Sequence, residues 1–231
     1  MMRAATPSKR PRDHRAVMAG RQDADEADFY PTPPWAARAG AELIRALDPG
    51  AVSVWEPACG AGHMVHGLRD YFDVVHASDA YLYDGNAIHD FTGDAAPPVR
   101  ADWIVSNPPF GQIEAFIRAA CAQAVRGVAM LMRAAVLESE GRYPLLYGEC
   151  PLTVFAPFSE RVPMHKGRWE DDGSTATFYA WFIFMKPERR ARRIMARVGD
   201  RFYPATLPIA PGQRKRLARA SDAAFAMSEA A

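Results

Sequence analysis

The sequence AVSVWEPACGAGH, residues 51–63, joins a short apolar run to a helical pattern through a turn that contains two glycines. The apolar run predicts a strand over residues 51–55, and the spacing after the turn predicts a helix over residues 63–71. At Gly60 and Gly62 the backbone can turn tightly and approach a ligand beside the helix N-terminus. Because the third glycine of a dinucleotide fingerprint is missing, NAD binding is disfavoured. The turn is therefore either a plain strand-to-helix connection or one wall of a ligand site.

Outward from this turn, short apolar runs alternate with helical patterns along most of the chain. Such alternation predicts βαβ units, in which a parallel sheet carries helices on both faces. The predicted strands are residues 51–55, 74–77, 101–106, 128–132, 152–156 and 175–185, and the predicted helices are residues 35–47, 63–71 and 112–125. An Arg-rich segment, residues 188–198, is interpreted as a further short helix.

Acidic residues after the glycine turn suit a ligand that contains adenosine. Asp79 lies at the end of the second predicted strand, 17 residues after Gly62. A carboxylate there can accept hydrogen bonds from both ribose hydroxyls. Asp90 and Phe91 then offer a carboxylate for an adenine amino group and a ring that can stack on the base. Each of these residues, taken alone, is also compatible with an ordinary turn.

The predicted strand at residues 101–106 runs directly into Asn107-Pro108-Pro109-Phe110. The two prolines end the β-ladder and leave the Pro108 carbonyl outside regular pairing, at the sheet edge where α/β folds bind ligands. The amide oxygen of Asn107 and this carbonyl form a pair of acceptors that can hold both hydrogens of an aromatic amino group. Phe110 would stack on the ring that bears this group. The alternative is a rigid turn that ends the strand, but the preceding motifs favour catalysis.

Five segments together resemble one enzyme family. They are Phe29-Tyr30-Pro31-Thr32-Pro33, Glu56-Pro57-Ala58-Cys59-Gly60-Ala61-Gly62, Asp79, Asp90-Phe91 and Asn107-Pro108-Pro109-Phe110. In this order they are similar to the S-adenosylmethionine-dependent N6-adenine DNA methyltransferases, above all to the small phage and prophage type. The resemblance spans residues 28–187. It implies the class I methyltransferase fold, an α/β Rossmann-like architecture with a seven-stranded, mostly parallel sheet and helices on both faces.

The resemblance also implies roles for the matching residues, with S-adenosyl-L-methionine as the cofactor and no metal. The implied cofactor-binding residues are Tyr30, Thr32 and Pro33 for the methionine part, Glu56, Ala58, Cys59, Gly60 and Gly62 around the amino group and the glycine turn, Asp79 for the ribose, and Asp90 and Phe91 for the adenine. The implied catalytic residues are Asn107, Pro108, Pro109 and Phe110. Asn107 and the Pro108 carbonyl would polarise the target amine, and Phe110 would stack on a flipped-out base. Methyl transfer would be a direct in-line displacement without a covalent enzyme intermediate.

The net charge of +1 hides a strong separation of charge along the chain. Residues 1–21 carry +5, residues 22–185 carry −11, and residues 186–219 carry +9. Basic ends on an acidic body suggest a polyanionic partner, here DNA, although solvated tails would show the same pattern. The candidate DNA contacts are Arg161, His165, Lys166 and Arg168 in a polar loop, and Arg189, Arg190, Arg192 and Arg193 in the basic segment. We expect the basic flanks to supply much of the nonspecific DNA affinity through phosphate contacts.

Length and composition set further limits. With 231 residues, of which 49% are hydrophobic, the chain can bury a core without disulfides. Its three cysteines form no C-x-x-C pair, so neither a disulfide framework nor a zinc site is expected. No apolar run is long enough to span a membrane, and the basic N-terminus lacks the apolar core of a secretory signal. We therefore expect a cytoplasmic protein without a membrane partner, and a homodimer stays open.

The expected organisation is a basic flexible arm over residues 1–28, a catalytic domain over residues 29–187 and a basic extension over residues 188–231. Because little chain follows the last predicted strand, we expect no separate target-recognition domain and no tight sequence specificity. The Asn-Pro-Pro-Phe tetrapeptide also occurs in enzymes that methylate RNA bases or protein glutamine, so these substrates stay open. A catalytically silent DNA-binding module that retains the fold is the other alternative.

Overall fold

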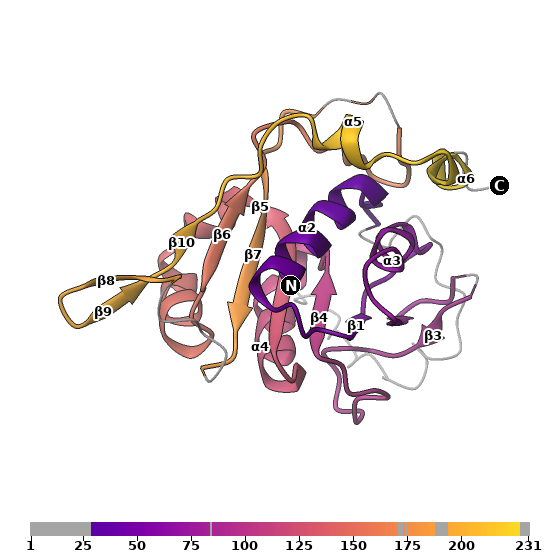
Figure 1. The fold of residues 1–231 in the computed structure, drawn as a ribbon. Helices are drawn as coiled ribbons and strands as arrows, with labels where there is room; N and C mark the ends of the chain where they lie inside the picture. Colours follow the sequence, from indigo (N-terminus) through magenta and orange to yellow (C-terminus); the bar gives the residue numbers. More distant parts are fainter. Residues whose placement is uncertain (1–28, 84, 171–172, 174, 188–193, 227–231) are drawn as a thin grey trace, which may run out of the picture.

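The computed structural model describes residues 29–83, 85–170, 173, 175–187 and 194–226 (Figure 1). The predicted arm at residues 1–28 and the candidate DNA contacts Arg189, Arg190, Arg192 and Arg193 lie outside the described residues. Within the described ranges, no helix is both long and apolar enough to cross a membrane. The same ranges contain no group of three or more His, Cys, Asp or Glu side chains that could hold a metal ion.

A mostly parallel sheet of eight strands forms the centre of the fold, in the order β10-β6-β7-β5-β4-β1-β2-β3. The strands are β1 (Ser53–Glu56), β2 (Val74–Asp79), β3 (Ala87–Ile88), β4 (Trp103–Ser106), β5 (Gly127–Arg133), β6 (Val154–Pro157), β7 (Tyr179–Met185) and β10 (Ala205–Thr206). All neighbours pair in parallel except β7, which runs antiparallel to β5 and β6. The predicted α/β class with a mostly parallel sheet is confirmed.

The sheet has one strand more than the seven predicted. The eighth strand, β10, pairs with the outer side of β6 through Ala205 and Thr206. Two residues carry no alternating apolar pattern, so only their tertiary position beside β6 makes them a strand. The helix expected over residues 188–198 is also wrong for its described part. Ala196–Val198 is instead strand β8, which forms a hairpin with β9 (Arg201–Tyr203).

Helices cover both faces of the sheet. The first face carries α2 (Pro34–Leu47) and α3 (His63–Leu68), and the second carries α4 (Ile113–Gln123) (Figure 1). In β4, Trp103 and Val105 belong to the apolar cluster beneath α2, whereas Ile104 belongs to the cluster beneath α4. Because successive side chains point to opposite faces, a strand covered on both sides is apolar throughout. The remaining short elements are 3₁₀ turns at Phe110–Gln112, Ala134–Leu137, Glu140–Arg142 and Ala220–Asp222 and a π-helical turn at Leu145–Glu149.

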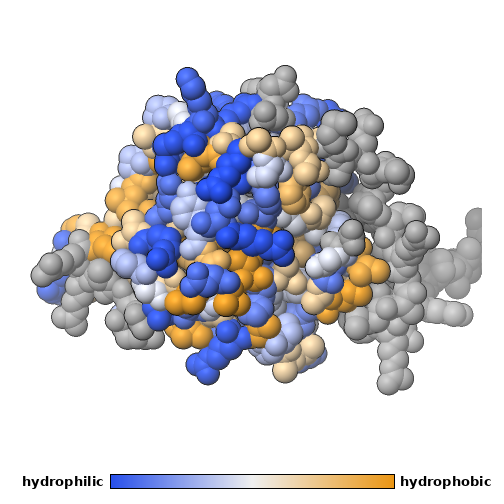
Figure 2. All heavy atoms as spheres, turned by 45° about the vertical axis from the view of Figure 1, so that its right-hand side comes forward, coloured by the Kyte–Doolittle hydropathy of each residue, from blue (hydrophilic) through white to orange (hydrophobic). Residues whose placement is uncertain are grey.

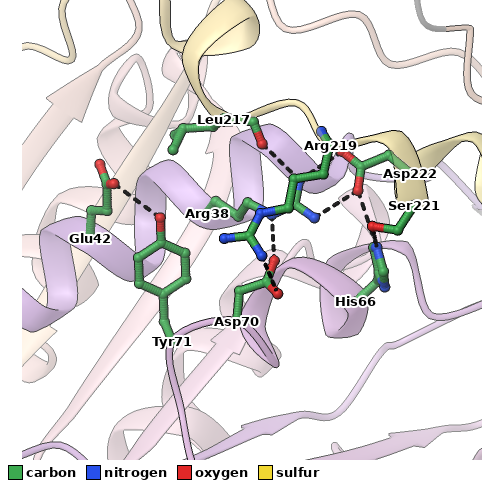
Figure 3. A network of polar contacts seen from close by, with 9 residues as sticks. All are labelled: Arg38, Glu42, His66, Asp70, Tyr71, Leu217, Arg219, Ser221 and Asp222. Carbon is green, nitrogen blue, oxygen red and sulfur yellow. Dashed lines mark hydrogen bonds and ion pairs between the residues drawn. The ribbon is translucent and has the colours of Figure 1, made fainter.

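After the hairpin the chain returns across α2 as a segment that we call the C-terminal strap, residues 205–226 (Figure 1). Its main elements are β10, α5 (Gln213–Leu217) and α6 (Ala223–Ala226). Leu217 of the strap is buried in the cluster beneath α2. Asp222 accepts two hydrogen bonds of 2.7 Å from the guanidinium of Arg38, which is completely buried (Figure 3). The basic extension is therefore packed onto the same body as the sheet.

The surface on the side of α3 and the end of the strap is mixed in character. Figure 2 shows hydrophilic side chains gathered across the top and centre of this face, with apolar residues in separate patches between and below them. Such scattered apolar residues are normal for a protein surface. Among the coloured residues of this view, no continuous apolar surface is present.

Candidate active site

Four parallel strands end beside one another at the carboxyl edge of the sheet. In chain order, β1 ends at Glu56, β2 at Asp79, β4 at Ser106 and β5 at Arg133. The sheet order β5-β4-β1-β2 places these strand ends next to one another. In α/β folds, ligands bind in the crevice outside the carboxyl ends of the strands. The structure thus brings the glycine turn, Asp79 and the tetrapeptide that starts at Asn107 to one edge.

Glu56 is a buried carboxyl group with one oxygen left without a partner. Its Oε1 accepts hydrogen bonds from the Ser106 hydroxyl at 2.7 Å and from the Ala58 N–H at 3.0 Å. Its Oε2 is buried and makes no hydrogen bond with any described residue. Burial raises the pKa of Glu56 to about 8, and the nearby charge of Asp79 acts in the same direction. A cationic ligand group that reached Oε2 would pair with it and favour the ionised form.

Asp79 holds the glycine turn against the end of β2. The Gly60 N–H donates to Asp79 Oδ2 at 2.8 Å, and the Tyr81 N–H donates to Oδ1 at 2.9 Å. Gly60 has a φ of +50°, and a Cβ at this position would lie 2.5 Å from the Phe29 ring. Glycine is therefore required there by both conformation and space. Because a carboxylate has about four acceptor positions, Asp79 retains capacity for further donors such as hydroxyl groups.

Cys59 belongs to the turn but is not a reactive thiol. Its N–H donates to the Ser78 carbonyl at 3.0 Å, which ties the turn to β2. Burial raises the pKa of the Cys59 thiol to about 12, and the charges of Glu56 and Asp79 contribute in the same direction. The thiolate is the nucleophilic form of cysteine. Cys59 is therefore neutral near pH 7 and contributes to the site through its backbone.

The two residues predicted to hold an adenine differ in their surroundings. Asp90 is exposed, and its Oδ1 accepts hydrogen bonds from the N–H and the hydroxyl of Thr92, each at 3.1 Å. Phe91 is only 3% exposed and packs against Trp55, with ring centres 5.2 Å apart, and against Phe116 at 5.1 Å. Phe91 is thus part of the core beneath α4, and Asp90 is the member of the pair that presents a polar group to solvent.

Asn107 follows β4 with its side-chain amide held in one orientation. Its Nδ2 donates to the Tyr30 carbonyl at 2.9 Å and lies 3.7 Å from Met164 Sδ. Because a carbonyl can only accept, the nitrogen of the amide must face Tyr30. The amide oxygen, Oδ1, is buried and has no hydrogen-bond partner in the part of the chain that the structure describes. An unpaired buried acceptor costs about 1–3 kcal/mol, so Oδ1 marks a position for a donor on a ligand.

The segment over residues 29–33 lies beside Asn107 and Phe110. The Tyr30 ring lies 4.8 Å from the Phe110 ring and is tilted by 56° to it. Thr32 is buried, and the Pro33 carbonyl accepts the N–H of Ala36 at 2.9 Å, which starts α2. The proline-rich segment is therefore held between Asn107 and the first turn of a buried helix.

Pro108 and Pro109 carry the chain from β4 toward α4. Pro108 is buried, and the Pro109 carbonyl accepts the N–H of Gln112 at 3.0 Å. This bond closes the 3₁₀ turn that begins at Phe110 and leads directly into α4. The tetrapeptide is thus fixed at both ends, by the strand before it and the turn after it.

The polar loop between β6 and β7 reaches the candidate site through Met164. The Met164 sulfur lies 3.7 Å from Asn107 Nδ2 and 4.0 Å from the Thr32 hydroxyl. The Gly167 N–H donates to the Phe29 carbonyl at 2.9 Å, so the loop is also bound to the segment over residues 29–33. The loop is therefore part of the wall of the site.

The four candidate DNA contacts of this loop are Arg161, His165, Lys166 and Arg168. Arg161, Lys166 and Arg168 are exposed, and His165 is half-buried. Arg161 donates to the Ala176 carbonyl at 2.9 Å, and Arg168 pairs with Glu170 at 2.5 Å. Three cations thus lie on the outer side of a loop whose inner side contacts Asn107.

Comparisons with known proteins identify the architecture. No protein-family model matches the sequence, and a search of curated proteins gives no match. One similar solved structure is a proposed RNA methyltransferase from Pyrococcus horikoshii, with a TM-score of 0.53 and 16% identity over 74% of this chain and 95% of that one. The chain has the class I methyltransferase fold.

A second solved structure with this methyltransferase fold is larger than the present chain. It is the methyltransferase subunit of a type I restriction-modification system from Streptococcus thermophilus, with a TM-score of 0.52 and 12% identity over 84% of this chain. The present chain spans 53% of that structure's length.

Three residues that contact the candidate site are not part of the sequence motifs described above. Ser106 orients Glu56, Met164 contacts Asn107, and Arg133 covers the Phe110 ring. Arg133 did carry a signal, because it is the first charged residue after the apolar run of β5. Met164 has no such signal in the sequence, because its position beside Asn107 depends on how the long loop between β6 and β7 folds.

Proposed function

We propose that this protein transfers the methyl group of S-adenosylmethionine to the N6 amino group of adenine in DNA. The observation that carries the proposal is the orientation of Asn107, whose Nδ2 is bound to the Tyr30 carbonyl while its buried Oδ1 has no partner among the described residues. The Pro108 carbonyl follows at the same sheet edge. Two acceptors in this arrangement suit the two hydrogens of an exocyclic amine. Phe110 offers the kind of ring on which a flipped-out base stacks.

The groups at the ends of β1 and β2 fit S-adenosylmethionine. The buried, unpaired Oε2 of Glu56 suits its ammonium group, and Asp79 has acceptor capacity for its ribose hydroxyls. Gly60 and Gly62 let the backbone pass close to the ligand. When bound, the cofactor supplies a methyl group on a positively charged sulfur, from which it can be displaced directly.

The protein residues act by positioning in this proposal. Asn107 Oδ1 and the Pro108 carbonyl accept the two amine hydrogens, which withdraws the nitrogen lone pair from the ring and directs it toward the methyl carbon. Transfer of the methyl group to this nitrogen would leave the electrons of the broken C–S bond on the sulfur and release the surplus amine proton to solvent. Alignment of two reactants can lower a barrier by about 7–11 kcal/mol. No protein nucleophile is needed, in agreement with the neutral thiol of Cys59.

The placement of charge supports a nucleic acid as the substrate, which in this proposal is DNA. The polar loop presents Arg161, Lys166 and Arg168 on its outer side, while its Met164 contacts Asn107. Cations beside a base-flipping site can neutralise phosphates, which gives affinity that falls with salt and carries little sequence information. The +9 charge of residues 186–219 adds to this field. We assign both segments to the proposed DNA contact surface.

Cofactor binding is expected to release a proton from Glu56. Burial holds the pKa of Glu56 at about 8 in the free protein, so this carboxyl group is mostly protonated at pH 7. A bound ammonium group stabilises the carboxylate and lowers this pKa. The affinity for S-adenosylmethionine should therefore rise between pH 6 and pH 7, by up to about tenfold. Calorimetry at pH 7 in buffers of different ionisation enthalpy should detect the release of about one proton per site.

The Glu56→Gln variant is the matched control for this linkage. It keeps the shape of the side chain and removes the titration, so it should bind the cofactor more weakly and release no proton. An affinity of the native protein that stays constant between pH 6 and pH 7 would argue against the contact between Glu56 and the ammonium group.

The proposed function is tested by offering labelled S-adenosylmethionine to the full-length protein with unmethylated duplex DNA, RNA and protein in parallel. N6-methyladenine among the nucleosides released from the DNA would support the proposal. Label found only in RNA or only in protein glutamine would mean that the protein is a methyltransferase whose substrate is not DNA. DNA binding without transfer to any acceptor would identify a silent binding module. Sequencing of methylated positions would then define the target.

A further inference from the structure

Arg133 is a cation at the catalytic edge that the proposed mechanism does not use. It is the last residue of β5, the strand beside β4. Its guanidinium carbon lies 3.9 Å from the centre of the Phe110 ring and 6.0 Å from the centre of the Tyr30 ring. A cation this close to a ring is attracted to it by about 0.5–2 kcal/mol. Arg133 therefore covers the ring on which the proposed function stacks the target base.

In the described part of the chain, the Arg133 guanidinium contacts these two rings and has no polar partner. Its Nε is buried and has no partner, and its guanidinium forms no hydrogen bond or ion pair with the residues that the structure describes. Arg38 and Arg126, by contrast, are bound to carboxylates. A buried N–H without an acceptor costs about 1–3 kcal/mol. Arg133 can thus leave the ring without breaking a hydrogen bond. Wherever its Nε–H finds an acceptor, the cost of the unpaired N–H is removed.

Tyr30 is another described neighbour of the Phe110 ring, and its backbone is fixed. Its carbonyl is bound to Asn107, and the following Pro31 restricts its backbone. Its ring is tilted by 56° to that of Phe110, whereas a base stacks with its plane parallel to the ring. A base that stacks on Phe110 would therefore take the place of the guanidinium, which no hydrogen bond holds over the ring.

We propose that Arg133 exchanges with the target base. As the base enters, the guanidinium leaves Phe110 and binds the backbone phosphate of the flipped nucleotide. This inference rests on the proposed function, because it requires a base at Phe110. A guanidinium suits both positions, since it is planar enough to stack on a ring and can bind a phosphate through two N–H groups. Arg133 is thus a positioning residue that covers Phe110 in the free protein and holds the nucleotide in the complex.

The test compares Arg133→Ala and Arg133→Lys in the full chain, with S-adenosylmethionine and a duplex that the native protein methylates. Arg133→Ala should raise the KM for DNA about tenfold with little change in kcat, because one charged phosphate contact is lost. It should also reduce the slope of log affinity against log salt by about 0.9, the value for one phosphate. Arg133→Lys keeps the charge and should retain the native slope. Cofactor affinity should not change in either variant.

The Arg118→Ala variant is the control, because Arg118 is a half-exposed arginine of α4 that pairs with Glu114 and Glu149. It should leave the KM and the salt slope unchanged. The inference is overturned if Arg133→Ala keeps the native KM for DNA and the native salt slope. It is also overturned if this variant has a lower melting temperature and a weaker affinity for the cofactor as well as a higher KM. In the latter case Arg133 only supports Phe110. A failure of the proposed function is recognised separately, because the native protein would then methylate no DNA.

Discussion

Replacing Asn107 with alanine is expected to reduce methyl transfer by about 10²-fold or more, by analogy with the loss of one preorganised hydrogen bond in other active sites. The native Oδ1 is a buried acceptor without a partner among the described residues, and alanine offers no acceptor in its place. The target amine then keeps its lone pair delocalised in the ring. Single-turnover rates with saturating cofactor and DNA measure this chemical step directly.

Two further measurements separate catalysis from folding in this variant. The affinity for S-adenosylmethionine should stay near the native value, because Glu56 and Asp79 lie at the ends of other strands. Asn107→Asp should fall between the native protein and the alanine variant, since it keeps an acceptor but loses the N–H that binds the Tyr30 carbonyl. A native transfer rate in Asn107→Ala would remove Asn107 from the mechanism.

The central sheet could be predicted because its signals are local. The strand at Trp103–Ser106 and the helix at Ile113–Gln123 have apolar patterns that can be recognised from the local sequence alone. The α/β alternation then limits the topology to parallel units with right-handed crossovers. By contrast, β10 consists of Ala205 and Thr206, which pair only because β6 lies beside them. A two-residue edge strand has no local pattern to predict it.

The motifs of the candidate site were visible because they follow the strand ends directly. Asn107 and Glu56 occupy such positions, and the structure brings both to the carboxyl edge. The burial of Phe91 against Trp55 could not be predicted, because an aromatic residue after a short apolar run suits either a core or a ligand surface. The position of Arg133 over Phe110 depends on how the turn after β4 packs against the end of β5.

The contacts of the C-terminal strap could not be predicted from the local sequence either. Arg38 and Asp222 are 184 residues apart, and neither has a pattern that indicates the other. The basic composition of the flank suggested a solvated, DNA-binding tail, yet its described part includes Leu217, which is buried in the same apolar cluster as residues of α2. Its α6 also adjoins the glycine-turn helix, where the Phe225 carbonyl lies 3.1 Å from His63 Nε2. Truncation would therefore disturb the fold, and DNA affinity is better tested by substituting exposed arginines.

Replacing Arg38 with alanine is expected to lower the free energy of unfolding by about 3–5 kcal/mol, the usual cost of removing one partner from a buried ion pair. The native side chain is completely buried and binds Asp70, Asp222 and the Leu217 carbonyl (Figure 3). Its loss leaves Asp222 charged and nearly buried between α2 and the strap. Urea unfolding followed by tryptophan fluorescence measures the change.

Arg216→Ala is the matched control, because Arg216 joins the same strap to the same helix through Glu42 but is half-exposed. Exposed ion pairs contribute about 0–1 kcal/mol, so this variant should remain close to the native stability. The double variant Arg38→Met/Asp222→Leu should be more stable than Arg38→Met alone, since an apolar pair replaces the stranded carboxylate. Equal losses in the Arg38 and Arg216 variants would mean that the buried network does not hold the strap in place. A large loss confined to Arg38 would instead make the strap an integral part of the fold beside the glycine turn.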